Sequence, residues 1–155
     1  FSASSEHAPI TLLPVAVSDK AGWATFSISK RARASNSLMG YGSSSTGGVL
    51  QNRTVPLVTL DGLLEEFPPP NVLKIDVEGA ELKVFEGAKR MLEAVRPLIY
   101  CEISGDNMDA LEQIFKKYSY KFLKGDEFSS IADLNRISNS IGFNTVAVPE
   151  EILTC

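Results

Sequence analysis

The sequence predicts a single α/β domain with a mostly parallel sheet, because strand-like and helix-like segments alternate along the chain. The 155 residues are 44% hydrophobic and 22% charged, which is typical of a globular protein with a core of its own. No internal repeat or linker divides the chain, so residues 1–155 are interpreted as one domain.

The N-terminal part predicts two strands and then a long irregular segment. Residues 10–18 (ITLLPVAVS) form a short apolar run that ends in a turn, which indicates a buried strand. Residues 23–28 alternate in polarity and indicate a second strand, antiparallel to its neighbour. Residues 29–52 are rich in serine and glycine without periodicity. We interpret them as either a substrate-facing lid or a surface loop.

The middle of the chain predicts a strand, a short helix and a central strand. Residues 55–58 form the first strand. The helix that follows is expected to have Thr59 or Asp61 as its cap and to end at a run of three prolines. Its apolar side chains follow the 3.6-residue period of a helix and are Leu60, Leu63, Leu64 and Phe67. Residues 72–76 (VLKID) are the best candidate for a central strand.

The C-terminal half continues the alternation. Residues 80–95 predict a helix that Arg96-Pro97 closes, and residues 98–103 (LIYCEI) predict a buried strand. Asp106 or Asn107 is expected to cap the next helix. Three further segments complete the chain: a strand at 120–123, a polar and partly helical connection at 125–142, and a last strand at 143–148.

The residues with most chemical potential follow the predicted central strand. Asp76, Glu78 and Glu81 bring three carboxylates into six residues around Gly79. Ligands of open α/β sheets bind at the carboxyl ends of parallel strands. Carboxylates this close raise one another's pKa, which suits a general base. The alternative is structural, with these acids favouring the positive end of the following helix.

Glu102 near the end of the next predicted strand leaves a second interpretation open. Asp76, Glu78 and Glu102 together would form an oxygen-rich set for a hard cation, as in a metal-dependent hydrolase. The sequence has no calcium-loop spacing, so we expect no metal. The single histidine, His7, has no obvious partner, which disfavours a Ser-His-Asp hydrolase.

Charge and cysteine content restrict the partners. The net charge is −4 and no long basic stretch occurs, so nucleic-acid binding is not expected. No apolar run approaches the roughly 18–20 residues of a membrane span. Two cysteines do not make a disulfide framework, which favours a reducing compartment and hence a cytoplasmic location.

The string at residues 72–81 (VLKIDVEGAE) resembles the hallmark of FkbM-type methyltransferases. Other segments resemble the same family over about residues 10–149. They are PVAVSDKAG at 14–22, VTLD at 58–61, Gly87-Ala88, Arg96-Pro97, Glu102 and the last strand at 144–149. The resemblance implies an enzyme of class I methyltransferase fold, with a Rossmann-like sheet that is mostly parallel and has an antiparallel last strand.

The resemblance also implies S-adenosylmethionine as the cofactor and a hydroxyl of a small molecule or sugar as the acceptor. Family members begin with a strand, a glycine-rich loop and a second strand, and residues 1–9 supply none of these. We therefore expect a truncated domain that lacks its first strands, binds the cofactor poorly by itself, is inactive alone, and exposes a strand edge and an apolar patch.

The resemblance assigns roles to individual residues. Ala16, Val17, Ser18 and Asp19 would border the adenine. Asp76 would face the sulfonium and take the proton of the attacking hydroxyl, with Glu78 beside it as the second catalytic carboxylate. Alternatively, the chain is a non-catalytic remnant of such an enzyme or an interaction module. The oligomeric state is not predicted.

Overall fold

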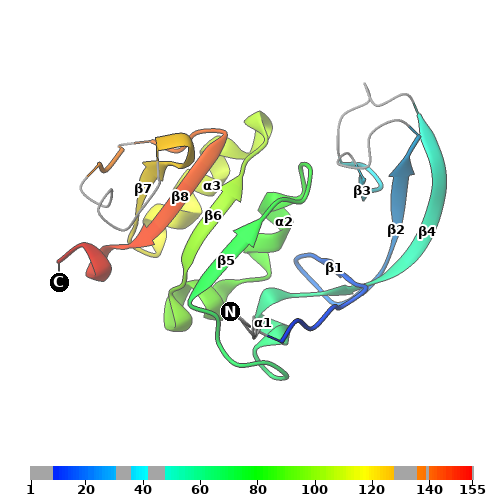
Figure 1. Ribbon diagram of the computed structural model, residues 1–155, viewed down its shortest axis with the longest axis horizontal. Coiled ribbons are helices and arrows are strands. Elements are labelled where there is room, and N and C mark those ends of the chain that lie inside the picture. The colour runs from blue at the N-terminus through cyan, green and yellow to red at the C-terminus, as the bar shows by residue number, and fades with distance from the viewer. Residues whose placement is uncertain (1–8, 31–35, 42–47, 128–135, 139, 155) are drawn as a thin grey trace, which may run out of the picture.

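The computed structural model describes residues 9–30, 36–41, 48–127, 136–138 and 140–154, which form two mixed sheets with helices (Figure 1). The two sheets lie next to each other, and strands from the N-terminal part of the chain form the first of them. No helix among the described residues is long and apolar enough to cross a membrane.

The first sheet has the strand order β1-β4-β2-β3. Its strands are β1 (Ala16–Val17), β2 (Gly22–Ser29), β3 (Ser37–Leu38) and β4 (Val49–Val58). β2 and β4 form a long antiparallel ribbon, while β1 pairs with the end of β4 in parallel. The first half of β4 is exposed to solvent, and for this reason the sequence pattern placed residues 49–52 in a loop.

The second sheet has the order β5-β6-β8-β7. Its strands are β5 (Val72–Ile75), β6 (Leu98–Glu102), β7 (Tyr120–Lys124) and β8 (Asn144–Pro149). β5 and β6 are parallel, and β8 lies between β6 and β7 in antiparallel pairing with both. The predicted antiparallel last strand is therefore confirmed.

The expected mostly parallel sheet is wrong for the described chain. Only two strand pairs, β1 with β4 and β5 with β6, are parallel. The other described pairs are antiparallel: β2 pairs in this way with β3 and β4, and β8 lies between β6 and β7 and runs antiparallel to both. The chain is thus an α/β domain with mixed sheets.

The core lies between the second sheet and the helices that cover one of its faces, α2 (Glu81–Glu86) and α3 (Met108–Lys117) (Figure 1). Phe115 of α3 is fully buried and contacts three aromatic rings. Its centroid lies 4.8 Å from that of Phe85, 5.9 Å from Tyr120 and 6.0 Å from Phe122. A smaller cluster around Leu123, Val146 and Val148 lies apart from this main core.

The helix predicted over 80–95 is broken in the structure. α2 ends at Glu86, and a π-helical segment, Met91–Val95, begins after a short interruption. Asp61 caps this second segment, because its carboxylate accepts hydrogen bonds from the backbone N–H groups of Arg90 (3.0 Å) and Met91 (2.9 Å). Thr59 caps α1 (Leu60–Leu63) instead, by accepting from the N–H of Gly62 at 2.9 Å.

Gly87 stands at this interruption, where the chain touches the end of β1. A Cβ atom there would overlap the carbonyl oxygen of Ser18. Because this oxygen belongs to the backbone, it cannot move aside as the end of a flexible side chain could. We therefore expect Gly87→Ala to destabilise the domain by about 1–3 kcal/mol, the usual cost of overpacking. Chemical denaturation would measure the loss. Gly105→Ala is the control, since a Cβ there meets no atom within 4 Å.

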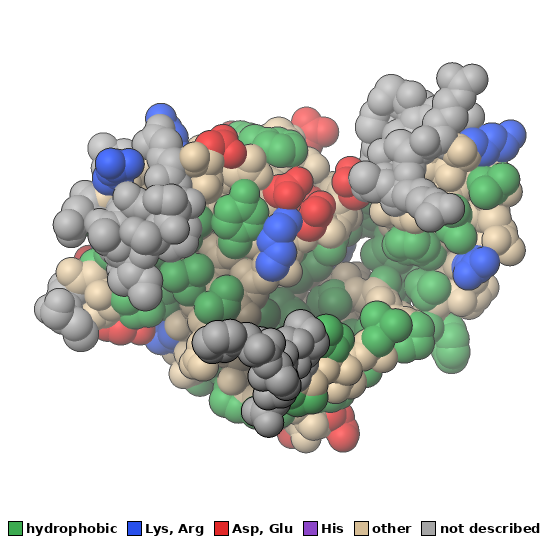
Figure 2. All heavy atoms as spheres, viewed as in Figure 1, with side chains coloured by type: hydrophobic (Ala, Val, Ile, Leu, Met, Phe, Trp, Pro, Cys, Tyr) green, Lys and Arg blue, Asp and Glu red, His purple; other side chains and the backbone are tan. Residues whose placement is uncertain are grey.

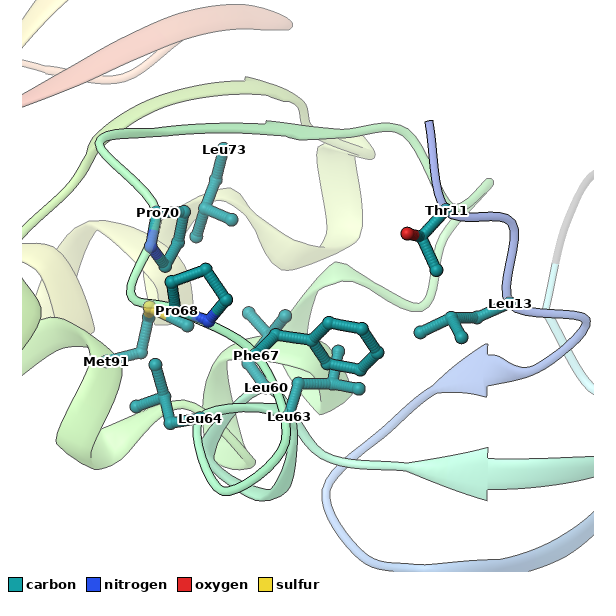
Figure 3. Close-up of a pocket in the computed structure, with 10 residues that line it drawn as sticks. All are labelled: Thr11, Leu13, Leu60, Leu63, Leu64, Phe67, Pro68, Pro70, Leu73 and Met91. Atoms are coloured by element: carbon teal, nitrogen blue, oxygen red, sulfur yellow. The ribbon is translucent and has the colours of Figure 1, made fainter. Parts of the chain in front are cut away.

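An apolar cavity of about 210 Å³ lies beside the edge strand β5 (Figure 3). α1 and the residues after it supply most of its wall, and Thr11 and Leu13 close the opposite side. Among the described residues no strand pairs with the outer side of β5, whose Val72 is 61% exposed. The expected exposed strand edge and apolar surface are both present.

Candidate active site

Asp76 and Glu78 follow β5 directly, at the carboxyl end of a parallel strand, as the sequence predicts. The chain then turns sharply into α2. Glu78 has a φ of 51° and Gly79 a φ of 100°, both in the left-handed region. A residue with a side chain seldom adopts such a φ, and strained backbone of this kind concentrates at functional sites.

Lys74 connects the ends of β5 and β6. Its ammonium lies 3.4 Å from the carboxylate of Asp76 and 2.9 Å from that of Glu102. All three side chains are between one third and one half exposed, so the pairs are screened by water and contribute little stability. Figure 2 shows acidic side chains gathered at this end of the second sheet, with one basic side chain next to them.

Glu78 differs from Asp76 because it is half-buried and has no cation beside it in the described contacts. Burial raises the pKa of the Glu78 carboxyl, and the negative charges of Asp76, Glu102 and Glu81 raise it further. The raised pKa of Glu78 agrees with the direction expected for carboxylates this close in sequence. A carboxyl with a raised pKa is a better proton acceptor once ionised.

Two neighbouring cavities open at this end of the sheet, and Glu78 lines both. The larger, about 470 Å³, is bordered by the turns after β5 and β6 and by residues of the segment after β3. Its described lining consists of Gly40, Tyr41, Glu78, Gly79, Ser104, Asp106 and Asn107. The smaller, about 50 Å³, lies among the carboxylates of Asp76, Glu78, Glu81 and Glu102, with Ser104 and Phe143.

The lid interpretation of residues 29–52 is supported in part, since Gly40 and Tyr41 face the larger cavity. Residues 31–35 and 42–47 lie outside the described residues. The alternative of a plain surface loop does not fit residues 49–52, which belong to β4.

Glu81 is the site residue whose contacts sequence reasoning missed. It is 1% exposed, and its carboxylate accepts hydrogen bonds from Gly79 N–H (2.7 Å), the Asn107 side chain (2.8 Å) and Ser104 N–H (3.4 Å). The sequence suggested helix capping, which accounts only for the bond from Gly79. The bonds from the loop after β6 are tertiary and leave no local signal in the sequence.

The family model of the methyltransferase FkbM domain matches residues 3–122, well over half of the chain. The chain belongs to this family. Hexuronic acid methyltransferase AglP of Haloferax volcanii is 34% identical over 98 residues, which are 62% of this chain and 38% of that protein. The matched part thus spans less than two thirds of this relative. No solved structure matches the chain.

Within this FkbM domain, the four residues that the resemblance places at the adenine lie at the end of β1. Ser18 is buried, and its N–H donates to Val58 O at 2.8 Å. Burial opposes ionisation of Asp19, but hydrogen bonds from Ser18 and Lys83 outweigh it and hold the pKa of Asp19 below its usual value. Neither cavity beside Glu78 is lined by any of residues 16–19.

The carboxylates of the FkbM domain do not form a metal centre in the described part of the chain. No group of three or more His, Cys, Asp or Glu side chains there is arranged to hold a metal ion. Lys74 lies between Asp76 and Glu102, the position that a cation shared by these two acids would need. His7 lies outside the described residues.

Proposed function

We propose that the protein containing this domain transfers a methyl group from S-adenosylmethionine to a hydroxyl group of an uncharged sugar or similar small molecule. The observation that carries the proposal is Glu78, a half-buried carboxylate that lines two cavities at the carboxyl end of β5 in a chain of a methyltransferase family. Its position supports contact with an acceptor.

Glu78 is our choice for the general base, in preference to Asp76. The Asp76 side chain is 47% exposed, and its carboxylate is already engaged by the ammonium of Lys74. Glu78 has a raised pKa and lines the larger cavity. It would take the proton of the acceptor hydroxyl as the oxygen bonds to the methyl carbon and the carbon–sulfur bond breaks.

S-adenosylmethionine, when bound, supplies an electrophilic methyl group on a positively charged sulfur. The carboxylates of Asp76 and Glu78 suit that positive charge, so the tip of β5 fits the sulfonium end. Ser18 and Asp19 are engaged with neighbouring backbone and with Lys83, so the fit to adenine rests on Ala16 and Val17 and on the family resemblance.

We further propose that the sheets are parts of a class I methyltransferase fold. The parallel pair β5 and β6, followed by the antiparallel β8 inserted before β7, supports this assignment. In such a fold the tip of β5 would border the cofactor, as ligands of open α/β sheets do.

The lining of the larger cavity suggests the charge of the acceptor. Its described residues include two carboxylates, Glu78 and Asp106, and neither lysine nor arginine. An anionic acceptor would be repelled there, whereas hydroxyl groups find acceptors in the carboxylates and an apolar ring face in Tyr41. An uncharged sugar therefore fits better than the hexuronic acid in the name of the Haloferax relative.

The test uses the full-length protein, labelled S-adenosylmethionine and matched pairs of neutral hexosides and hexuronides that differ only at the carboxylate. We expect kcat/KM to be at least about tenfold higher for the neutral member, since like-charge repulsion of ~1.4 kcal/mol already gives that factor. Preference for the hexuronides would contradict the acceptor assignment. Transfer to no hydroxyl compound would contradict the function.

A further inference from the structure

The buried carboxylate of Glu81 joins the two turns that border the larger cavity. Its Oε1 accepts from Gly79 N–H at 2.7 Å, and its Oε2 accepts from the Asn107 amide at 2.8 Å. The same Asn107 amide nitrogen also donates to Gly79 O at 2.9 Å. Gly79 is thereby held through both its N–H and its carbonyl group.

Gly79 directly follows Glu78, whose φ of 51° is costly for a residue with a side chain. Left-handed backbone of this kind persists only where surrounding contacts enforce it. Three hydrogen bonds among Gly79, Glu81 and Asn107 fix this turn, together with a longer backbone bond of 3.4 Å from Ala80 N–H to Val77 O. Ser104 N–H adds a longer bond of 3.4 Å to the Glu81 carboxylate.

We infer that Glu81, together with Asn107, is a positioning residue that holds the turn after β5 so that Glu78 points into the acceptor cavity. The inference rests on the proposed function for the role of Glu78. Asn107 precedes α3 but makes no capping bond with its side chain, so its bonds to Glu81 and Gly79 are not those of a helix cap.

The main variant is Glu81→Gln, which keeps the size of the side chain. Its amide NH₂ group would face the N–H groups of Gly79 or Asn107, which need an acceptor. In the full-length protein we expect kcat to fall about 100-fold, because a misplacement near 1 Å has that effect. We expect KM for S-adenosylmethionine to change less than about threefold, because the hydrogen bonds of Glu81 position Glu78 and do not contact the cofactor in this proposal. Glu86→Gln removes the same charge from the exposed side of α2 and should alter neither.

The pH profile separates positioning from loss of structure. The charge of Glu81 contributes to the raised pKa of Glu78, so Glu81→Gln should move the acidic limb of kcat to lower pH. Asn107→Ala removes two of the bonds without removing a charge. Asn107→Ala should lower kcat in the same way while the charge of Glu81 stays in place. It also serves as the test if Glu81→Gln does not fold.

A second readout does not depend on activity. Carbon-13 NMR of the Glu78 carboxyl and hydrogen exchange of the Gly79 amide should both change in Glu81→Gln, with exchange faster by about tenfold or more. Wild-type kcat in the folded variants, or a lower kcat with both NMR readouts unchanged, overturns the inference. If the wild type transfers no methyl group, the proposed function fails, and the NMR readouts alone then uphold or overturn the positioning by Glu81.

Discussion

Replacing Glu78 with glutamine should lower kcat for methyl transfer by about 10²–10⁴-fold, the range that a positioned general base contributes. Glutamine has nearly the same shape but accepts no proton at neutral pH. KM for S-adenosylmethionine should change much less, because Asp76 retains its charge at the tip of β5. Steady-state kinetics of the full-length protein with a labelled methyl group would measure both constants.

The pH dependence of the wild type provides a control on the same residue. Only ionised Glu78 accepts a proton, and its pKa lies above the ordinary value of 4.5 because of burial and three neighbouring carboxylates. Activity should therefore fall on acidification from a pH above 4.5. Glu102→Gln removes one of those charges and should shift the fall to lower pH. A variant Glu78→Gln with the turnover of the wild type would refute its role as base.

Replacing Phe115 with alanine should reduce the free energy of unfolding by about 3–5 kcal/mol, as large core deletions do. Phe115 is fully buried, and its ring packs against Phe85 of α2 and against Tyr120 and Phe122 of β7. The deletion would leave a cavity where the two helices meet the sheet. Urea denaturation would show a lower midpoint with little change in slope.

Phe143→Ala is the matched control, since it deletes the same ring at a position that is 60% exposed. Its effect on unfolding should be much smaller, because little apolar surface is returned to water. Equal losses for the two variants would show that the core is not organised around Phe115 as the structure indicates.

The sequence predicted best where the local pattern and the tertiary environment agree. The run VLKID at 72–76 indicated a strand with acids at its carboxyl end, and β5 with Asp76 confirms it. The helical spacing that begins at Leu60 indicated a short helix, and α1 begins at that residue, whose side chain is buried. These features depend on periodicity within one segment, which a single sequence contains.

The remainder depends on contacts between distant segments. The exposed half of β4 shows no alternation, since neither of its faces is covered, so only its pairing with β2 makes it a strand. The helix over 80–95 breaks because Gly87 touches Ser18 and Asp61 caps the second part. Glu81 and Asn107 both looked like helix caps, while their main bonds join two turns across the site.

A structure of the full-length protein with S-adenosylhomocysteine and a bound sugar would test the central claim most directly. We predict that the acceptor hydroxyl lies within about 2.6–3.2 Å of the Glu78 carboxylate, the reach of a general base. We also predict that the sulfur lies on the Asp76 side of that hydroxyl. A sugar bound away from the turn after β5, with Glu78 facing solvent, would contradict the account.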